Sequence, residues 1–156
     1  MDPAKSAVVV RCARRQFRGN PQFNRDTLPQ ALAEFQIDYE HVSALGGLRG
    51  HGRDVPPGVN AFWQNQSFHN YADYALGHDF RVAFRRLLDL GHQVPTALMC
   101  AEALWWRCHR RIIADYLIAA GETVFHVMRP DRIERASITP AAKLERENVI
   151  TYPAAA

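Results

Sequence analysis

The chain has 156 residues, of which 47% are apolar and 22% charged, a balance typical of a folded globular protein and not of a disordered one. No apolar run approaches the ~18 residues that span a bilayer, and three cysteines are too few for a disulfide scaffold. We therefore expect a cytoplasmic protein without membrane contacts, and an arginine-rich one, since only two of its 19 basic residues are lysines.

Short apolar runs alternate with stretches of helical periodicity along most of the chain. The run at Ala7–Val10 is β-branched and unbroken, as in a strand that is buried on both faces. The predicted elements are, in chain order, a strand at 7–10, a helix at 27–35, a strand at 37–42, a long Gly- and Pro-rich loop at 45–60, helices at 68–75 and 80–88, a strand at 96–100, a helix at 104–117 and a strand at 123–128.

This alternation predicts one α/β domain over residues 1–156, with no internal boundary. Its strands are too apolar for a sheet that is exposed on one face, so we expect a mostly parallel sheet of about four strands between helices, in three layers. After residue 128 the chain is mostly polar, and its last residues, YPAAA, have an unstructured appearance.

The segment that follows the third predicted strand concentrates reactive side chains. Ligands of parallel α/β sheets bind outside the carboxyl ends of the strands, where Cys100 is expected. A helix beginning a few residues later would favour its thiolate. Cys100 is then the predicted nucleophile or redox thiol, with Glu102 or His109 handling the proton and Arg11 and Arg110 holding a small anionic or nucleotide-like substrate.

Two other interpretations of this segment stay open. Cys108 shares a helical face with Leu104 and Ile112, as a core residue would, and Cys100 itself is as compatible with packing as with function. Cys100, Cys108 and His109 are also suitable metal ligands, but their spacing matches no common zinc motif. We predict no cofactor and keep a metal ion as the weaker alternative.

A second group of residues combines amides with aromatic rings. Asn24, Trp63 and Asn65 belong to segments in which asparagines are interleaved with aromatic side chains, a combination that suits nucleotides and single-stranded nucleic acid. The same residues also suit a loop whose amides bond to its backbone and whose rings anchor it to the core. The sequence therefore leaves an enzyme and a non-catalytic nucleic-acid-binding module as competing hypotheses.

At these residues the chain resembles a known family. The segments are NPQFN at 20–24, LGGLR at 45–49, NAFWQNQSFHNYADYA at 60–75 and ALMCAEALWWRCHRRIIADYL at 97–117, and together they resemble the family called domain of unknown function 488 (DUF488), over residues 8–138. The resemblance implies a three-layer α/β fold with characteristic positions at Cys100, Glu102, Cys108, His109 and Arg110. It implies no particular reaction.

The chain also departs from the pattern of that family. Relatives begin with an additional strand and helix, and Val9, Arg14 and Gln16 stand where they have aspartate, proline and serine. We therefore expect an N-terminally truncated or degenerate, inactive copy. An exposed sheet edge beside residues 7–10 would then favour self-association.

Overall fold

The computed structural model describes residues 6–12, 21–24, 26–52, 54–102 and 104–155. The chain divides into two compact units, the first formed by Met1–Gly46 and Asp79–Ala101, the second by Gly47–His78 and Glu102–Ala156. The sequence expected no internal boundary. Helices and a three-stranded sheet form the first unit, and helices with two small hairpins form the second, so each is described by itself.

The sheet of the first unit is parallel and has the order β2-β1-β3. Its strands are β1 (Ala7–Arg11), β2 (Ile37–His41) and β3 (Thr96–Met99). Val8 and Val10 of the central strand are 2% and 0% exposed, as the unbroken β-branched run predicts. The last register pairs join Arg11 to His41 on one side and to Met99 on the other, so all three strands end at the same edge.

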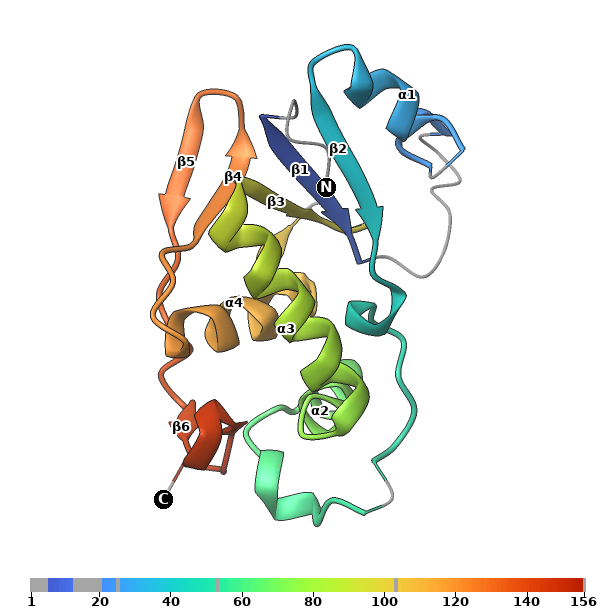
Figure 1. Ribbon diagram of the computed structural model, residues 1–156. Helices are drawn as coiled ribbons and strands as arrows, with labels where there is room; N and C mark the ends of the chain where they lie inside the picture. The colour runs from blue at the N-terminus through green and yellow to red at the C-terminus, as the bar shows by residue number, and fades with distance from the viewer. Residues whose placement is uncertain (1–5, 13–20, 25, 53, 103, 156) are drawn as a thin grey trace. The chain divides into compact units, whose positions relative to one another are not determined.

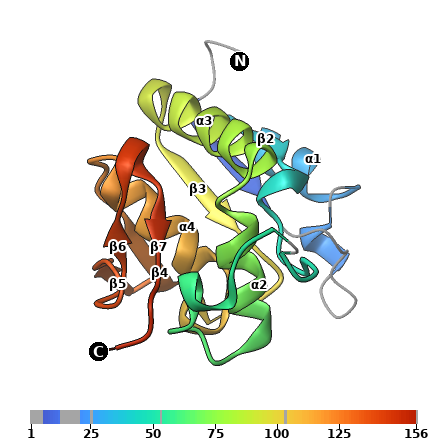
Figure 2. The same ribbon diagram turned by 90° about the horizontal axis from the view of Figure 1, so that it is seen from below.

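Two helices accompany this sheet. α1 (Leu28–Ala33) lies beside β2, and α3 (His78–Gln93) runs across one face of the sheet (Figures 1 and 2). The buried residues of α3 recur at helical spacing, so its apolar stripe faces inward: Phe80, Ala83, Phe84, Leu87 and Leu90. The first unit is thus an α/β structure in which helices flank a three-stranded parallel sheet.

Two expectations about the sheet are wrong. The predicted fourth strand forms as β4 (Phe125–Arg129), but it pairs antiparallel with β5 (Arg132–Arg135) in a separate hairpin. A tight turn at residues 130–131 makes that local pairing available, without a crossover. The edge expected beside residues 7–10 is also absent, because β1 is paired on both sides. Any association through the sheet would have to use β2 or β3.

The second unit contains α2 (Gln66–Tyr74), α4 (Arg110–Ala119) and two hairpins. The second hairpin, formed by β6 (Lys143–Leu144) and β7 (Ile150–Thr151), is visible near the C-terminus in Figure 2. The Asn65 side chain caps α2 by accepting hydrogen bonds from the Ser67 and Phe68 amides. The break between α2 and α3 falls at Gly77, in agreement with the sequence.

Tyr152, the first residue of the segment YPAAA that looks unstructured in the sequence, is packed within the second unit. Ile150 and Tyr152 are both 0% exposed. The Tyr152 hydroxyl donates to Asp115 Oδ2 at 2.8 Å, and the Tyr152 amide donates to Asn60 Oδ1 at 3.0 Å. Asn60 in turn donates to Asp73 Oδ1 at 2.7 Å. A buried polar network therefore holds Tyr152 in place. This network could not be predicted from the apolar content of the segment alone.

Most of the remaining predicted elements are confirmed in type and position. In the described residues of the predicted loop at 45–60, the chain forms a 3-10 turn at Pro57–Asn60, and another turn, Ser43–Leu45, ends where the loop begins. No helix in the described part of the chain is long and apolar enough to cross a membrane.

Candidate functional site: thiols at the strand ends and at the start of α4

Two cysteines lie at the carboxyl ends of neighbouring strands in the first unit. Cys12 directly follows β1 and Cys100 directly follows β3, one position beyond the Arg11–Met99 register pair. Their sulfur atoms lie within 4.8 Å of each other. The Cys12 amide donates to the Met99 carbonyl at 3.0 Å, and its thiol donates to the same oxygen at 3.3 Å. We call Cys12 and Cys100 the strand-end thiol pair.

The two thiols differ in exposure. Cys12 is 0% exposed, whereas Cys100 is only partly buried. The sequence identified Cys100 but not Cys12, because the pairing depends on strand order, which periodicity does not reveal. A usable signal was present, since Cys100 ends a short apolar run and Cys12 lies two residues after the end of another. Two thiols this close are also a pair of soft metal ligands.

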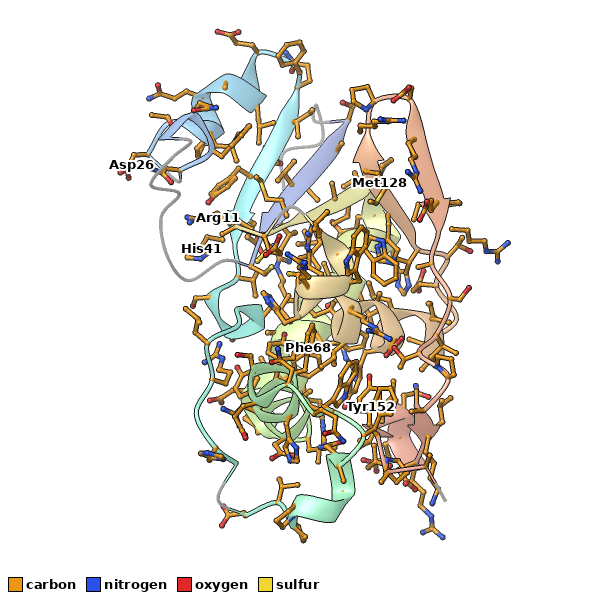
Figure 3. All side chains as sticks on the ribbon, turned by 180° about the vertical axis from the view of Figure 1, so that it is seen from behind. Arg11, Asp26, His41, Phe68, Met128 and Tyr152 are labelled. Atoms are coloured by element: carbon orange, nitrogen blue, oxygen red, sulfur yellow. The ribbon has the colours of Figure 1, made fainter. Side chains whose placement is uncertain are left out.

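Arg11, a predicted anion-binding residue, is the last residue of β1 and is 1% exposed. Figure 3 shows it close to His41, its register partner at the end of β2. An arginine side chain carries a positive charge, so Arg11 adds a buried positive charge at the end of β1. The other basic residues among the first 25, Lys5, Arg14, Arg15, Arg18 and Arg25, lie outside the described residues.

The helix predicted to start near Cys100 begins later. α4 starts at Arg110, and the described residues between β3 and α4 form a 3-10 turn at Trp105–Arg107. The apolar spacing of 104–108 imitates a helix, but Cys108 is extended, with φ −120° and ψ 146°. The effect of a helix N-terminus on a thiol therefore applies to Cys108, two residues before α4, and not to Cys100.

Cys108 is 3% exposed and receives several polar contacts within the second unit. Its sulfur accepts hydrogen bonds from the Arg110 amide at 3.4 Å and from Arg110 Nε at 3.3 Å, and His109 Nδ1 is 3.6 Å away. The sequence predicted burial for this residue, which is confirmed, but not the donors around it. We call Cys108, His109 and Arg110, with Glu102, the Cys108 cluster.

Glu102, a predicted proton-handling group, occupies the start of this cluster. Its Oε1 atom accepts a hydrogen bond from the Leu104 amide at 3.0 Å, and its backbone carbonyl accepts one from the Arg110 guanidinium. The Glu102 side chain is exposed. Both contacts hold the turn before α4, so Glu102 has a structural role there. Its role as a proton-handling group stays a prediction.

His109, the other predicted proton-handling group, is held between a ring and a glycine. The centroid of its ring lies 4.8 Å from that of Tyr71. A Cβ at Gly47 would lie 2.8 Å from His109 Nδ1, a distance that real Cβ atoms essentially never show. Gly47 belongs to the Gly- and Pro-rich loop predicted at 45–60. Its lack of a side chain is what allows the backbone to approach the imidazole.

A second histidine of this unit stacks on Trp105. The His126 ring is parallel to the indole within 2°, and the ring centroids are 4.0 Å apart. Burial, together with the positive charge of Arg110, lowers the pKa of His126 below its ordinary value of 6.5. His126 is therefore a neutral ring at neutral pH and acts there as a packing surface for Trp105.

The residues predicted for nucleic-acid binding have structural contacts. Trp63 is 6% exposed and stacks on Phe68 with 4.9 Å between ring centroids, while Tyr152 meets it edge-on at 5.1 Å. Phe68 and Tyr152 are labelled in Figure 3. Asn65 caps α2, and the Asn24 carbonyl accepts the amides of Thr27 and Leu28 at the start of α1. A base could stack on Trp63 only if the indole were exposed, and it is buried. Nucleic-acid binding through this loop stays a prediction.

The fold and the site describe an α/β protein with thiols at the carboxyl ends of its parallel strands. The chain matches the family model Domain of unknown function DUF488 over residues 4–117, and it belongs to that family. The match includes both thiol groupings and ends inside α4, earlier than the resemblance over 8–138 suggested. No curated protein and no solved structure matches the chain.

Proposed function

We propose that the protein performs thiol chemistry at Cys100 on a small anionic substrate. The observation that carries this proposal is the position of Cys100: partly exposed, at the carboxyl end of β3, with a second sulfur within 4.8 Å. In parallel α/β sheets this edge is where ligands bind. A purely structural cysteine would instead be expected to be buried, as Cys108 is.

The charge distribution of the first unit supports an anionic reactant. Arg11 ends the strand that adjoins β3, and its charge is almost entirely shielded from water. Where such a charge lies close to a thiol it favours thiolate over thiol, and it attracts anionic groups more strongly than an exposed charge would. Glu102 and His109 as proton-handling groups, and Arg110 as a second anion-binding group, stay predictions from the sequence.

The pH dependence of alkylation tests this proposal. Iodoacetamide reacts with thiolates, so the rate at each cysteine, resolved by peptide mass spectrometry, reports how readily that thiol ionises. We expect the rate at Cys100 to rise with a midpoint well below about pH 8.5, the ordinary value for a cysteine thiol. A midpoint at or above that value would overturn the proposal.

A matched pair of variants separates charge from packing. Arg11→Lys keeps a positive charge at the end of β1, whereas Arg11→Met removes it at similar size. We expect the midpoint for Cys100 to shift upward in Arg11→Met and to stay near the wild-type value in Arg11→Lys. Equal midpoints in both variants and the wild type would show that Arg11 does not act on the thiol.

A further inference from the structure

We propose that Cys12 and Cys100 form a reversible disulfide, which makes the strand-end thiol pair a dithiol–disulfide redox centre for low-molecular-weight disulfides. This inference rests on the proposed function in one respect, since it also takes Cys100 as the reactive thiol. It adds a second residue, a reaction and a substrate class.

The backbone geometry suits such a bond. β1 and β3 are adjacent and parallel, and the cysteines follow the Arg11–Met99 register pair by one residue each. The hydrogen bond from the Cys12 amide to the Met99 carbonyl, at 3.0 Å, keeps the two chains together at this point. Neighbouring strands are about 4.8 Å apart, and disulfides join Cα atoms that are about 4.4–6.8 Å apart. Rotation of the side chains can therefore close the sulfur–sulfur distance without separating the strands.

The different exposure of the two thiols assigns their roles. The thiolate that attacks a substrate must be reachable from solvent, which Cys100 is and the fully buried Cys12 is not. Cys12 can only attack a sulfur already bound within the site. Cys100 is thus the attacking residue and Cys12 the resolving residue.

The reaction balances as a two-electron exchange. The Cys100 thiolate attacks one sulfur of a disulfide RSSR, the S–S bond breaks, and one RS⁻ leaves and takes up the proton that Cys100 lost. Cys12 then loses its proton and attacks the Cys100 sulfur of the mixed disulfide, and the second RS⁻ leaves and is protonated. The protein is oxidised to the Cys12–Cys100 disulfide, and the substrate is reduced to two thiols.

Oxidised glutathione, an anionic disulfide, is the probe for the test. The full-length protein is incubated with it, alkylated, digested without reduction and mapped by mass spectrometry. We expect the wild type to lose two hydrogens and yield linked Cys12 and Cys100 peptides, with no lasting adduct. Cys12→Ser should instead accumulate one glutathionyl group on Cys100. Cys108→Ser, the control from the second unit, should behave as the wild type.

Each other outcome has a definite meaning. A stable glutathionyl adduct on Cys100 in the wild type, with Cys12 still alkylable after unfolding, overturns the disulfide and leaves the proposed function standing. Absence of any reaction at Cys100, with slow alkylation as well, overturns both. If Cys12→Ser does not fold, Cys100→Ser decides the roles: Cys12 should then stay unmodified, and a glutathionyl group on Cys12 would contradict its assignment as the resolving thiol.

Discussion

The absence of a side chain at Gly47 allows the backbone of the second unit to approach His109. A Cβ at this position would lie 2.8 Å from His109 Nδ1, whereas one at Gly50 would meet nothing within 4 Å. We expect Gly47→Ala to lower the free energy of unfolding by about 1–3 kcal/mol, as overpacked sites do. Gly50→Ala, the control in the same loop, should have an effect close to zero. Urea unfolding of the two variants measures both values.

A second substitution shows whether the clash is with His109. Truncation in His109→Ala removes the ring that Gly47 faces, so Gly47→Ala should cost much less in that background. The coupling between the two substitutions, obtained from a double-mutant cycle, should be about 0.5–3 kcal/mol. Additive effects would show that Gly47 matters for a reason other than its approach to the imidazole.

Asp115 gives the second unit a specific pH dependence. Burial raises the pKa of its carboxyl above the ordinary 3.8, against the opposing effect of the hydrogen bonds from the Thr139 amide and the Tyr152 hydroxyl. The folded state then holds this proton more tightly than the unfolded chain. Its contribution to stability is fully present below pH 3.8 and is lost as the pH rises through the raised pKa.

Comparison with Asp115→Asn isolates this contribution. The amide keeps the shape of the side chain but does not titrate. We expect the wild type to lose stability relative to Asp115→Asn as the pH rises from about 4 toward neutrality, in the direction that a raised carboxyl pKa requires. Unfolding free energies of both proteins at several pH values measure the difference. A difference that is constant with pH, or that changes in the opposite direction, would contradict the assignment.

Among the elements, α2 depends on a side chain that the sequence suggested for a different role. Asn65 accepts hydrogen bonds from the Ser67 and Phe68 amides at 2.9 and 3.3 Å. Loss of such a cap costs about 1 kcal/mol, which is the expected effect of Asn65→Ala on the free energy of unfolding. Gln64→Ala, at the exposed residue just before the cap, is the control. Equal stabilities of the two variants would show that the cap does not hold the helix.

Elements with local signals could be predicted from the sequence. The strands at β1, β2 and β3 and the helices at α2 and α3 follow from β-branched runs, apolar periodicity and the break at Gly77. The start of α4 could not be predicted from spacing, because the side-chain contacts of Glu102 and Cys108 hold a turn in a segment with helical periodicity. The pairing of β4 could not be predicted either, because the sequence was compatible both with a crossover to the parallel sheet and with a local hairpin to β5.

The candidate site shows the same limit. Cys100 could be selected because it ends a strand, which is a property of the local sequence. Cys12 acquires a role only through the order β2-β1-β3, which brings two cysteines that are 88 positions apart to neighbouring strand ends. Tyr152 and Asp115 likewise meet through a buried network that joins distant segments. Composition alone does not reveal such pairings.

In the whole molecule, the two units contain thiols in different surroundings. The first unit has the strand-end thiol pair, in which Cys100 is partly exposed and Cys12 is buried, and a buried arginine, Arg11, at the end of β1. The second has Cys108, which is buried and accepts two hydrogen bonds from Arg110, while His109 Nδ1 lies 3.6 Å from its sulfur. If Cys100 is the reactive thiol, it should be the one cysteine of the three that reacts rapidly in the folded protein.

The most direct test compares the alkylation of each cysteine at pH 7 in the folded protein and in denaturant. We predict that Cys100 reacts in the folded protein at least as fast as in the unfolded chain, because it is accessible and its thiolate is favoured. Cys12 and Cys108 should be protected until the protein unfolds, since both are almost fully buried. Labelling of Cys100 only after unfolding would contradict the account and make it a packing residue.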